Sequence, residues 1–170
     1  TFPQITGSTV GHNWTSNRRN QNFSLIGNVM IFSAYDAANG VEIWKTNGTA
    51  AGTALLKDIK AGTGGSTPWG YCKIGSEVFF SAMQTGFERK LWKTDGTTPG
   101  TVQVPVPEPF FISDFAVGKI NNKMTFFATN TVDGYEPYVS DGTPGGTVML
   151  KNINATLNQS GNGSPTSAQA

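Results

Sequence analysis

The chain has 170 residues, a formal net charge of +1 and only 14% charged residues. Twelve Lys and Arg against eleven Asp and Glu leave no basic surface of the kind that nucleic acids or acidic membranes attract. The single cysteine, Cys72, excludes an internal disulfide, and no apolar run reaches the ~18 residues of a membrane-spanning helix. We therefore expect no nucleic-acid partner and no membrane insertion.

Residues 1–22 are predicted to form an irregular N-terminal segment with few strand signals. This segment holds His12, the only histidine of the chain, next to two of its six Asn-x-Ser/Thr sequons, at Asn13 and Asn22. One histidine and one cysteine cannot form a His/Cys metal cluster, and Ser-His-Asp catalysis would depend on His12 alone. The sequence therefore predicts neither kind of site.

Three repeat units follow, and two sequence elements recur in each of them in phase. The first is an aromatic strand signal at residues 31–34, 79–82 and 126–129. The second is an aromatic residue followed by Asx-Gly-Thr, and its aromatic position is occupied by Trp44, then 48 residues later by Trp92, then 46 residues later by Tyr138. This double periodicity predicts an internal triplication, with units at 23–68, 69–109 and 110–153.

Each unit reads as four short strands, most clearly in the second, where strands are predicted at 71–74, 77–82, 90–93 and 102–106. Aromatic and β-branched runs separated by Gly, Asp and Pro are typical of strands and turns, and no helical periodicity is present. Four antiparallel strands in 40 to 50 residues indicate an all-β fold of β-propeller-like blades. Stacked β-sandwich or solenoid units are the alternative.

The Asx-Gly-Thr segment is predicted to be a structural turn between the third and fourth strands. Asp or Asn caps its own turn through a side-chain oxygen, and Gly supplies a positive φ. Asn in the first unit keeps the acceptor without the charge, which favours a structural role. The turn residues are Asn47, Gly48, Thr49, Asp95, Gly96, Thr97, Asp141, Gly142 and Thr143.

Aromatic residues that recur in phase are predicted to form a repeat core between sheets, namely Trp44, Trp92, Tyr138, Phe32, Phe80 and Phe127. Stacking on sugar rings is the alternative for these side chains. Aromatic residues that no repeat rule demands are better candidates for a partner surface, and these are Trp14, Trp69, Phe87, Phe110 and Phe111.

The acidic residues do not predict chemistry. The position of Glu42 and Glu136 is occupied by Lys90 in the middle unit. Variation of this kind is expected of residues that decorate a repeat, and a paired-carboxylate site does not require it. The loop aspartates are single and widely separated, whereas a Ca²⁺ site needs several oxygen ligands close together. We predict no enzyme and no cofactor, with Ca²⁺ as the alternative to turn capping.

Residues 154–170 are predicted to be a polar C-terminal linker. Its apolar content is low, and three sequons crowd it. Together with the two N-terminal sequons, these are the candidate glycosylation sites: Asn13, Asn22, Asn154, Asn158 and Asn162.

Residues 42–49, followed by Gly52-Thr53 and Lys57-Asp58-Ile59, resemble the ELWxxDGT repeat family of secreted and surface-attached proteins. The resemblance covers roughly residues 23–153 and implies a β-propeller-like fold in long extracellular proteins, with no known ligand. Unit 2 departs from the pattern at Lys90 and lacks the Lys-Asp-Ile ending, and unit 3 has Pro137-Tyr138 for Leu-Trp.

Two functions are therefore predicted. The first is an extracellular structural or assembly module of a surface appendage, matrix or adhesin, and the second is a carbohydrate-binding propeller. A closed propeller takes at least about four blades, so three units are expected to associate with other copies of the chain or with further repeats. The assembly is expected to be a homo-oligomer or filament.

Overall fold

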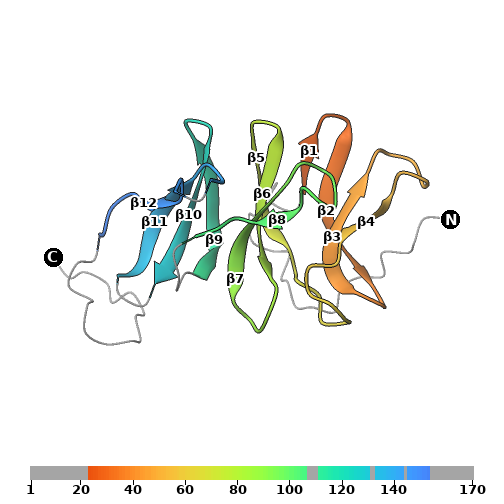
Figure 1. The fold of residues 1–170 in the computed structure, drawn as a ribbon, viewed down its shortest axis with the longest axis horizontal. Coiled ribbons are helices and arrows are strands. Elements are labelled where there is room, and N and C mark those ends of the chain that lie inside the picture. The colour runs from red at the N-terminus through yellow and green to blue at the C-terminus, as the bar shows by residue number, and fades with distance from the viewer. Residues whose placement is uncertain (1–22, 107–110, 131–132, 144, 154–170) are drawn as a thin grey trace.

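The structure is a computed structural model that describes residues 23–106, 111–130, 133–143 and 145–153. These residues form twelve strands and no helix, arranged as three separate antiparallel sheets (Figure 1). The all-β class and the four-stranded antiparallel units predicted from the sequence are confirmed. The three sheets stand side by side in chain order and do not close on one another (Figure 1).

Each sheet is a meander in which strands adjacent in sequence are adjacent in the sheet. The first sheet consists of β1 (Phe23–Ile26), β2 (Val29–Asp36), β3 (Gly40–Thr46) and β4 (Ala54–Lys57). The second consists of β5 (Trp69–Ile74), β6 (Glu77–Met83), β7 (Arg89–Thr94) and β8 (Val102–Gln103). The third consists of β9 (Phe111–Ile120), β10 (Lys123–Asn130), β11 (Gly134–Ser140) and β12 (Val148–Met149).

The first hairpin of every unit has a two-residue turn, and the first residue of each turn has a positive φ. Gly27 and Gly75 have φ values of 56° and 58° in the first two units. In unit 3 the turn is Asn121-Asn122, with φ values of 49° and 57°. Asn is the non-glycine residue best suited to this conformation, and a hairpin with both turn residues at positive φ matches the strand twist.

Two hydrophobic cores lie between the sheets, so the middle sheet is buried on both faces. Successive strand residues point to opposite faces, which sends Phe80 into the core shared with unit 1 and Phe79 into the core shared with unit 3. We call the face toward the preceding unit the leading face; in unit 2 it comprises Tyr71, Val78, Phe80, Ala82 and Trp92. The opposite, trailing face of unit 2 comprises Ile74, Phe79, Leu91 and Val104.

The predicted repeat core between sheets is corrected at three positions. Phe32 and Trp44 belong to neither core and are half-buried on the leading face of unit 1. Phe127 is 41% exposed, whereas Phe126 is 2% exposed. Phe126 pairs with Tyr138 across the strands, as Phe80 pairs with Trp92. The core aromatic residue of unit 3 is therefore Phe126, one residue earlier than predicted. A shift of one residue moves a side chain to the other face of a sheet, so Phe127 lies on the exposed face and Phe126 in the core.

The fourth strand of unit 2 is shorter than predicted, since β8 ends at Gln103 rather than at residue 106. Val104 still donates its N–H to the carbonyl of Leu91 at 2.8 Å. Pro105, which has no N–H, follows immediately and cannot extend the ladder.

Candidate association surfaces

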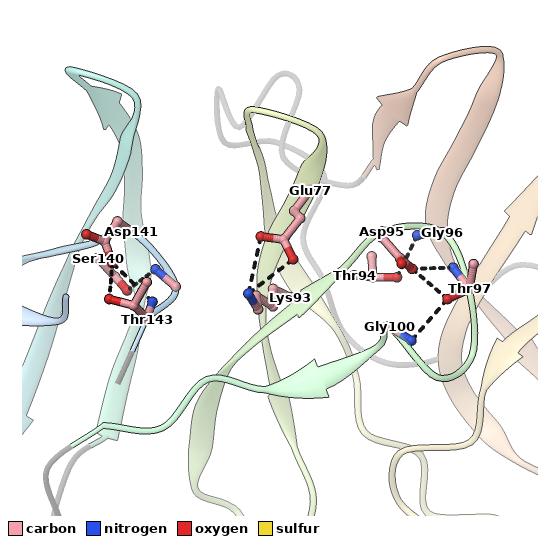
Figure 2. Close-up of polar contacts among 11 residues, drawn as sticks. Glu77, Lys93, Thr94, Asp95, Gly96, Thr97, Gly100, Ser140, Asp141 and Thr143 are labelled. Carbon is pink, nitrogen blue, oxygen red and sulfur yellow. Dashed lines mark hydrogen bonds and ion pairs between the residues drawn. The ribbon is translucent and has the colours of Figure 1, made fainter. Parts of the chain in front are cut away.

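The Asx-Gly-Thr turn joins the third and fourth strands of each sheet and closes through side-chain hydrogen bonds. Figure 2 shows these bonds in units 2 and 3. In unit 2, Oδ1 of Asp95 accepts the backbone N–H of Thr97 at 2.8 Å and its hydroxyl at 2.7 Å. The same hydroxyl oxygen accepts the N–H of Gly100 at 3.0 Å. A Cβ atom on Gly100 would lie 2.1 Å from Asp95 Oδ1, so the closed turn leaves space only for glycine there.

A chain of hydroxyl groups ties this turn to the strand ends. Gly96 donates its N–H to Oγ1 of Thr94 at 3.0 Å, and the hydroxyl of Thr101 donates to the carbonyl of Thr97 at 2.7 Å. The hydroxyl oxygens of Thr94 and Thr101 lie 2.8 Å apart. Because the Thr101 proton is already engaged, Thr94 must be the donor between them. The second Gly-Thr of the motif is therefore part of the turn.

Units 1 and 3 repeat this geometry. Oδ1 of Asn47 accepts the N–H of Thr49 at 3.1 Å, and Oδ1 of Asp141 accepts that of Thr143 at 3.0 Å. In both units the threonine hydroxyl donates to the same oxygen at 2.7 Å. Hydrogen bonds from the threonine hydroxyl and N–H lower the pKa of Asp95 and of Asp141 below the ordinary value. Since Asn47 builds the same turn, the geometry does not require a charge.

The turn of unit 2 docks on the sheet of unit 1. The ammonium group of Lys57 donates to the carbonyl of Thr101 at 2.7 Å, and the hydroxyl of Thr98 donates to the carbonyl of Leu56 at 2.8 Å. The bonds join residues 42 to 44 positions apart. The motif is therefore a contact between units as well as a turn within one.

The space around the central glycine of each turn shows how closely that turn approaches the preceding unit. A Cβ on Gly142 would lie 2.4 Å from Cζ of Phe79, and one on Gly96 would lie 3.7 Å from Cδ1 of Ile26. A Cβ on Gly48 would meet no described atom within 4 Å. The turn of unit 1 therefore carries the docking motif without a described neighbour to receive it.

Glu42 is a fully buried carboxylate that holds the connection between units 1 and 2. It accepts the N–H groups of Ile59 and Lys60, each at 3.1 Å, and both the N–H and the hydroxyl of Ser66. Burial raises its pKa, and the four donated hydrogen bonds oppose that shift. The structure corrects the prediction that Glu42 is repeat decoration, since nothing about a single Glu in the sequence indicates that it is buried.

Glu136 makes the corresponding contact in unit 3, where Ile153 donates its N–H at 2.8 Å. The separation between carboxylate and isoleucine is 17 residues in both units. In unit 2 the position is Lys90, whose ammonium group lies 4.9 Å from the centre of the Phe111 ring. Unit 2 thus lacks both the glutamate and the Lys-Asx-Ile ending. Their joint absence from one unit was the signal in the sequence that the two contact each other.

Backbone hydrogen bonds identify which residues of units 2 and 3 are equivalent. Val104 donates its N–H to the carbonyl of Leu91, and Leu150 donates to the carbonyl of Pro137, each at 2.8 Å. Leu150 therefore occupies in unit 3 the trailing-face position of Val104.

The trailing face of unit 3 exposes large apolar side chains. Its members Ile120, Leu150 and Ile153 are 57%, 55% and 67% exposed. Their counterparts covered by a following unit, Ile74, Val104 and Ile59, are 6%, 0% and 6% exposed. Phe127 lies on the same face, opposite Pro137. Isolated exposed apolar residues are common, but a full set at positions that are core elsewhere indicates a contact surface.

The leading face of unit 1 is the other outer face of the three sheets, and it too exposes residues whose counterparts are buried. Phe23 is 46% exposed, whereas its counterpart Tyr71 is 5% exposed and stacks on Phe80. Phe32 and Trp44 are half-buried, whereas the predicted core residues Phe80, Trp92 and Tyr138 are buried. The burial of this position thus follows the presence of a preceding unit.

The aromatic residues proposed as a separate partner surface are not gathered by the described structure into one patch. Phe87 is 93% exposed in the β6–β7 loop, while Trp69 and Phe111 are half-buried in strands. Trp14, Phe110 and the sequons at Asn13, Asn22, Asn154, Asn158 and Asn162 lie outside the described residues.

Among the described residues, no group of three or more His, Cys, Asp or Glu side chains could hold a metal ion. No described helix is long and apolar enough to cross a membrane. The Cys72 thiol is half-buried, and burial raises its pKa. A deprotonated, nucleophilic thiolate is therefore disfavoured at this position.

Comparison with known proteins finds no matching family model, no matching curated protein and no matching solved structure. The resemblance to ELWxxDGT repeats therefore stays a prediction, carried by the motif residues themselves.

Proposed function

We propose that this chain is a non-enzymatic assembly module that works through contacts between repeat units. The trailing face of unit 3 carries the proposal. Its three exposed apolar residues stand where units 1 and 2 have buried core. Covering them at about 25 cal/mol per Å² of apolar surface would favour association, and leaving them in water would not.

The proposed setting is the outside of a cell, in a surface appendage, matrix or adhesin. Three features support this: a polar surface with few charges, the number of sequons, and the motif resemblance. Intact-mass analysis of the protein from its natural source tests the setting in part. Glycan mass on any sequon would agree with it, and export can be measured directly by fractionating the cells.

Assembly itself is tested by sedimentation velocity over a range of micromolar concentrations. We expect species heavier than the chain mass of 18.1 kDa, in proportions that rise with concentration. A monomer at every concentration, with cooperative unfolding, would contradict the proposed function.

Carbohydrate binding is the second candidate, and the leading face of unit 1 favours it. Phe23, Phe32 and Trp44 line that face with partly accessible rings, and aromatic rings stack on the apolar faces of sugars. A glycan array with wild type and Phe23→Ala tests this function. Binding that the substitution abolishes would support it, and an array without signal would remove it.

A further inference from the structure

The boundary between units 1 and 2 shows what two units of this chain need in order to pack. Unit 1 contributes Leu56 and Ile59 from its trailing face, and unit 2 contributes Phe80 and Trp92 from its leading face. Lys57, which lies between the two aliphatic residues, crosses the boundary to the carbonyl of Thr101. Apolar burial supplies attraction here, and the ammonium-to-carbonyl bond fixes the register.

Unit 3 has the residues that unit 1 contributes to this boundary. Leu150, Lys151 and Ile153 stand where unit 1 has Leu56, Lys57 and Ile59, and all three are exposed. The buried carboxylate of Glu136 holds Ile153 as Glu42 holds Ile59. Unit 2 lacks this set, so unit 3 presents to its next neighbour the surface that unit 1 presents to unit 2.

Unit 1 has, on its leading face, the residues that unit 2 contributes to this boundary. Phe32 and Trp44 occupy the positions of Phe80 and Trp92, and the two pairs have the same cross-strand register. Thr53 takes the place of Thr101, whose carbonyl receives a lysine at the existing boundary. Both halves of a third boundary are therefore present in one chain, at its two outer sheets (Figure 1).

We propose that two copies of the chain dock head to tail, with the trailing face of unit 3 on the leading face of unit 1 of the second copy. In this contact Lys151 reaches the carbonyl of Thr53, and Leu150 and Ile153 pack on Phe32 and Trp44. This inference rests on the proposed assembly function and names its partner. Two copies bring six sheets, within the range of about four to eight blades that close a propeller.

Charge favours this pairing over a symmetric one. Two trailing faces docked on each other would place Lys151 near Lys151 of the second copy, and like charges brought together are unfavourable. Head to tail, each lysine meets a backbone carbonyl instead. The contact is therefore heterologous, and with two copies it is made twice and closes into a ring.

The test is a mixing experiment between two variants, each of which spoils one face at an exposed position. Leu150→Asp places a charge on the trailing face, and Phe23→Asp places one on the leading face. We expect wild type at twice 18.1 kDa and each variant alone at 18.1 kDa, both still folded by circular dichroism. Equal amounts mixed should again give the doubled mass, at higher protein concentration than wild type needs, because each mixed pair retains one of its two contacts intact.

A second pair, Ile153→Asp with Leu25→Asp, repeats the test in case one of the first substitutions disturbs folding. Leu25 lies two residues from Phe23 in β1 and therefore shares the leading face. The two side chains are 67% and 50% exposed. Phe87→Asp is the matched control, since Phe87 is exposed outside both faces. It should assemble as wild type does.

Four results would overturn the pairing. If only the trailing-face variants disrupt an assembling protein, or if the mixture stays monomeric, the contact is not head to tail, although assembly stands. If Phe87→Asp alone abolishes assembly, the surface lies elsewhere. If wild type itself stays monomeric, the second copy is excluded and the proposed function fails with it.

Discussion

The two boundaries between units use similar sheet faces and different connections. At the first, the linker is held by the buried Glu42 through four hydrogen bonds. At the second, Lys90 stands in its place, and the chain continues through Pro105. The cores nevertheless correspond: Phe80 with Trp92 at the first boundary, and Phe126 with Tyr138 at the second.

This difference separates what holds two sheets together from what guides the chain between them. If the core provides most of the attraction, a boundary needs no particular linker, and two units on different chains can pack as two on one chain do. The proposed contact between copies depends on that condition. Substitutions at matched positions of the two boundaries measure it directly.

The largest effect is expected from emptying the cores. Trp92 is 4% exposed at the first boundary and Tyr138 is 6% exposed at the second. Replacing either with Ala should lower the free energy of unfolding by about 3–5 kcal/mol, the range for deleting a large buried aromatic side chain. Urea denaturation followed by fluorescence gives both values.

Trp44→Ala is the control within the same measurement, because this ring is half-buried and should cost clearly less. A loss below about 1 kcal/mol for Tyr138→Ala would mean that the second boundary is not held by its core in the way the first is.

The docking turns should rank next. Gly142→Ala adds a Cβ 2.4 Å from Phe79 at φ 81°, whereas Gly96→Ala adds one 3.7 Å from Ile26 at φ 90°. Positive φ costs about 1–2 kcal/mol for an alanine, and overpacking adds roughly 1–3 kcal/mol for Gly142 alone. Thermal unfolding should therefore rank Gly142→Ala as the more damaging.

Gly48→Ala measures the backbone cost without contact, since its Cβ would meet no described atom within 4 Å. Equal losses for all three variants would show that the added methyl group meets no steric resistance from the preceding unit, and would leave only backbone strain.

The linkers give the third comparison. Glu42→Gln turns one acceptor oxygen into an NH₂ group that faces N–H donors, so buried donors lose a partner, at a cost of about 1–3 kcal/mol. Lys90→Gln removes a cation from the Phe111 ring, a contact worth roughly 0.5–1 kcal/mol at a partly exposed site. Hydrogen exchange adds a local reading, because the amides of Ile59 and Lys60 should exchange faster in Glu42→Gln only.

A smaller loss for Glu42→Gln than for Lys90→Gln would reverse the interpretation of the two linkers. The buried carboxylate would then be tolerated at its position rather than needed there.

The strands and sheets of each unit were predictable from the sequence because they depend on local signals that repeat. Aromatic and β-branched runs give the strands, the Asx-Gly-Thr turn gives a hairpin, and each appears three times. Register was harder to predict. Phe126 and Phe127 are both aromatic, and only the 12-residue spacing to Tyr138, equal to that between Phe80 and Trp92, distinguishes them.

The association surfaces could not be predicted from single residues. Ile120, Leu150 and Ile153 look like core in the sequence, and their exposure follows from the absence of a described neighbour beyond unit 3. Glu42 was missed for the opposite reason, because a charged residue reads as surface until its donors, 17 to 24 residues away, are located.

The smallest effect concerns the charge in the turns, where the first boundary again differs from the second. The hydroxyl and N–H of Thr97 hold the pKa of Asp95 below its ordinary value, with a smaller contribution from Lys45 of unit 1. At the second boundary, Asp141 is paired within its own unit, with Lys123 at 3.5 Å. Asn47 shows that the turn forms without charge, so the carboxylates should affect stability only through pH.

A carboxyl group whose pKa is lower in the folded protein contributes stability above its unfolded pKa and loses it as pH falls through the folded value. Asp95→Asn should therefore flatten the decline in unfolding free energy below pH ~4, by less than about 0.5 kcal/mol because the group is exposed and screened. Urea titrations of wild type, Asp95→Asn and Asp141→Asn at several pH values measure it. Added salt should shrink the Asp141 effect more, because among the described residues Asp141 forms an ion pair, with Lys123, and Asp95 forms none. A steeper decline in Asp95→Asn than in wild type would contradict the lowered pKa.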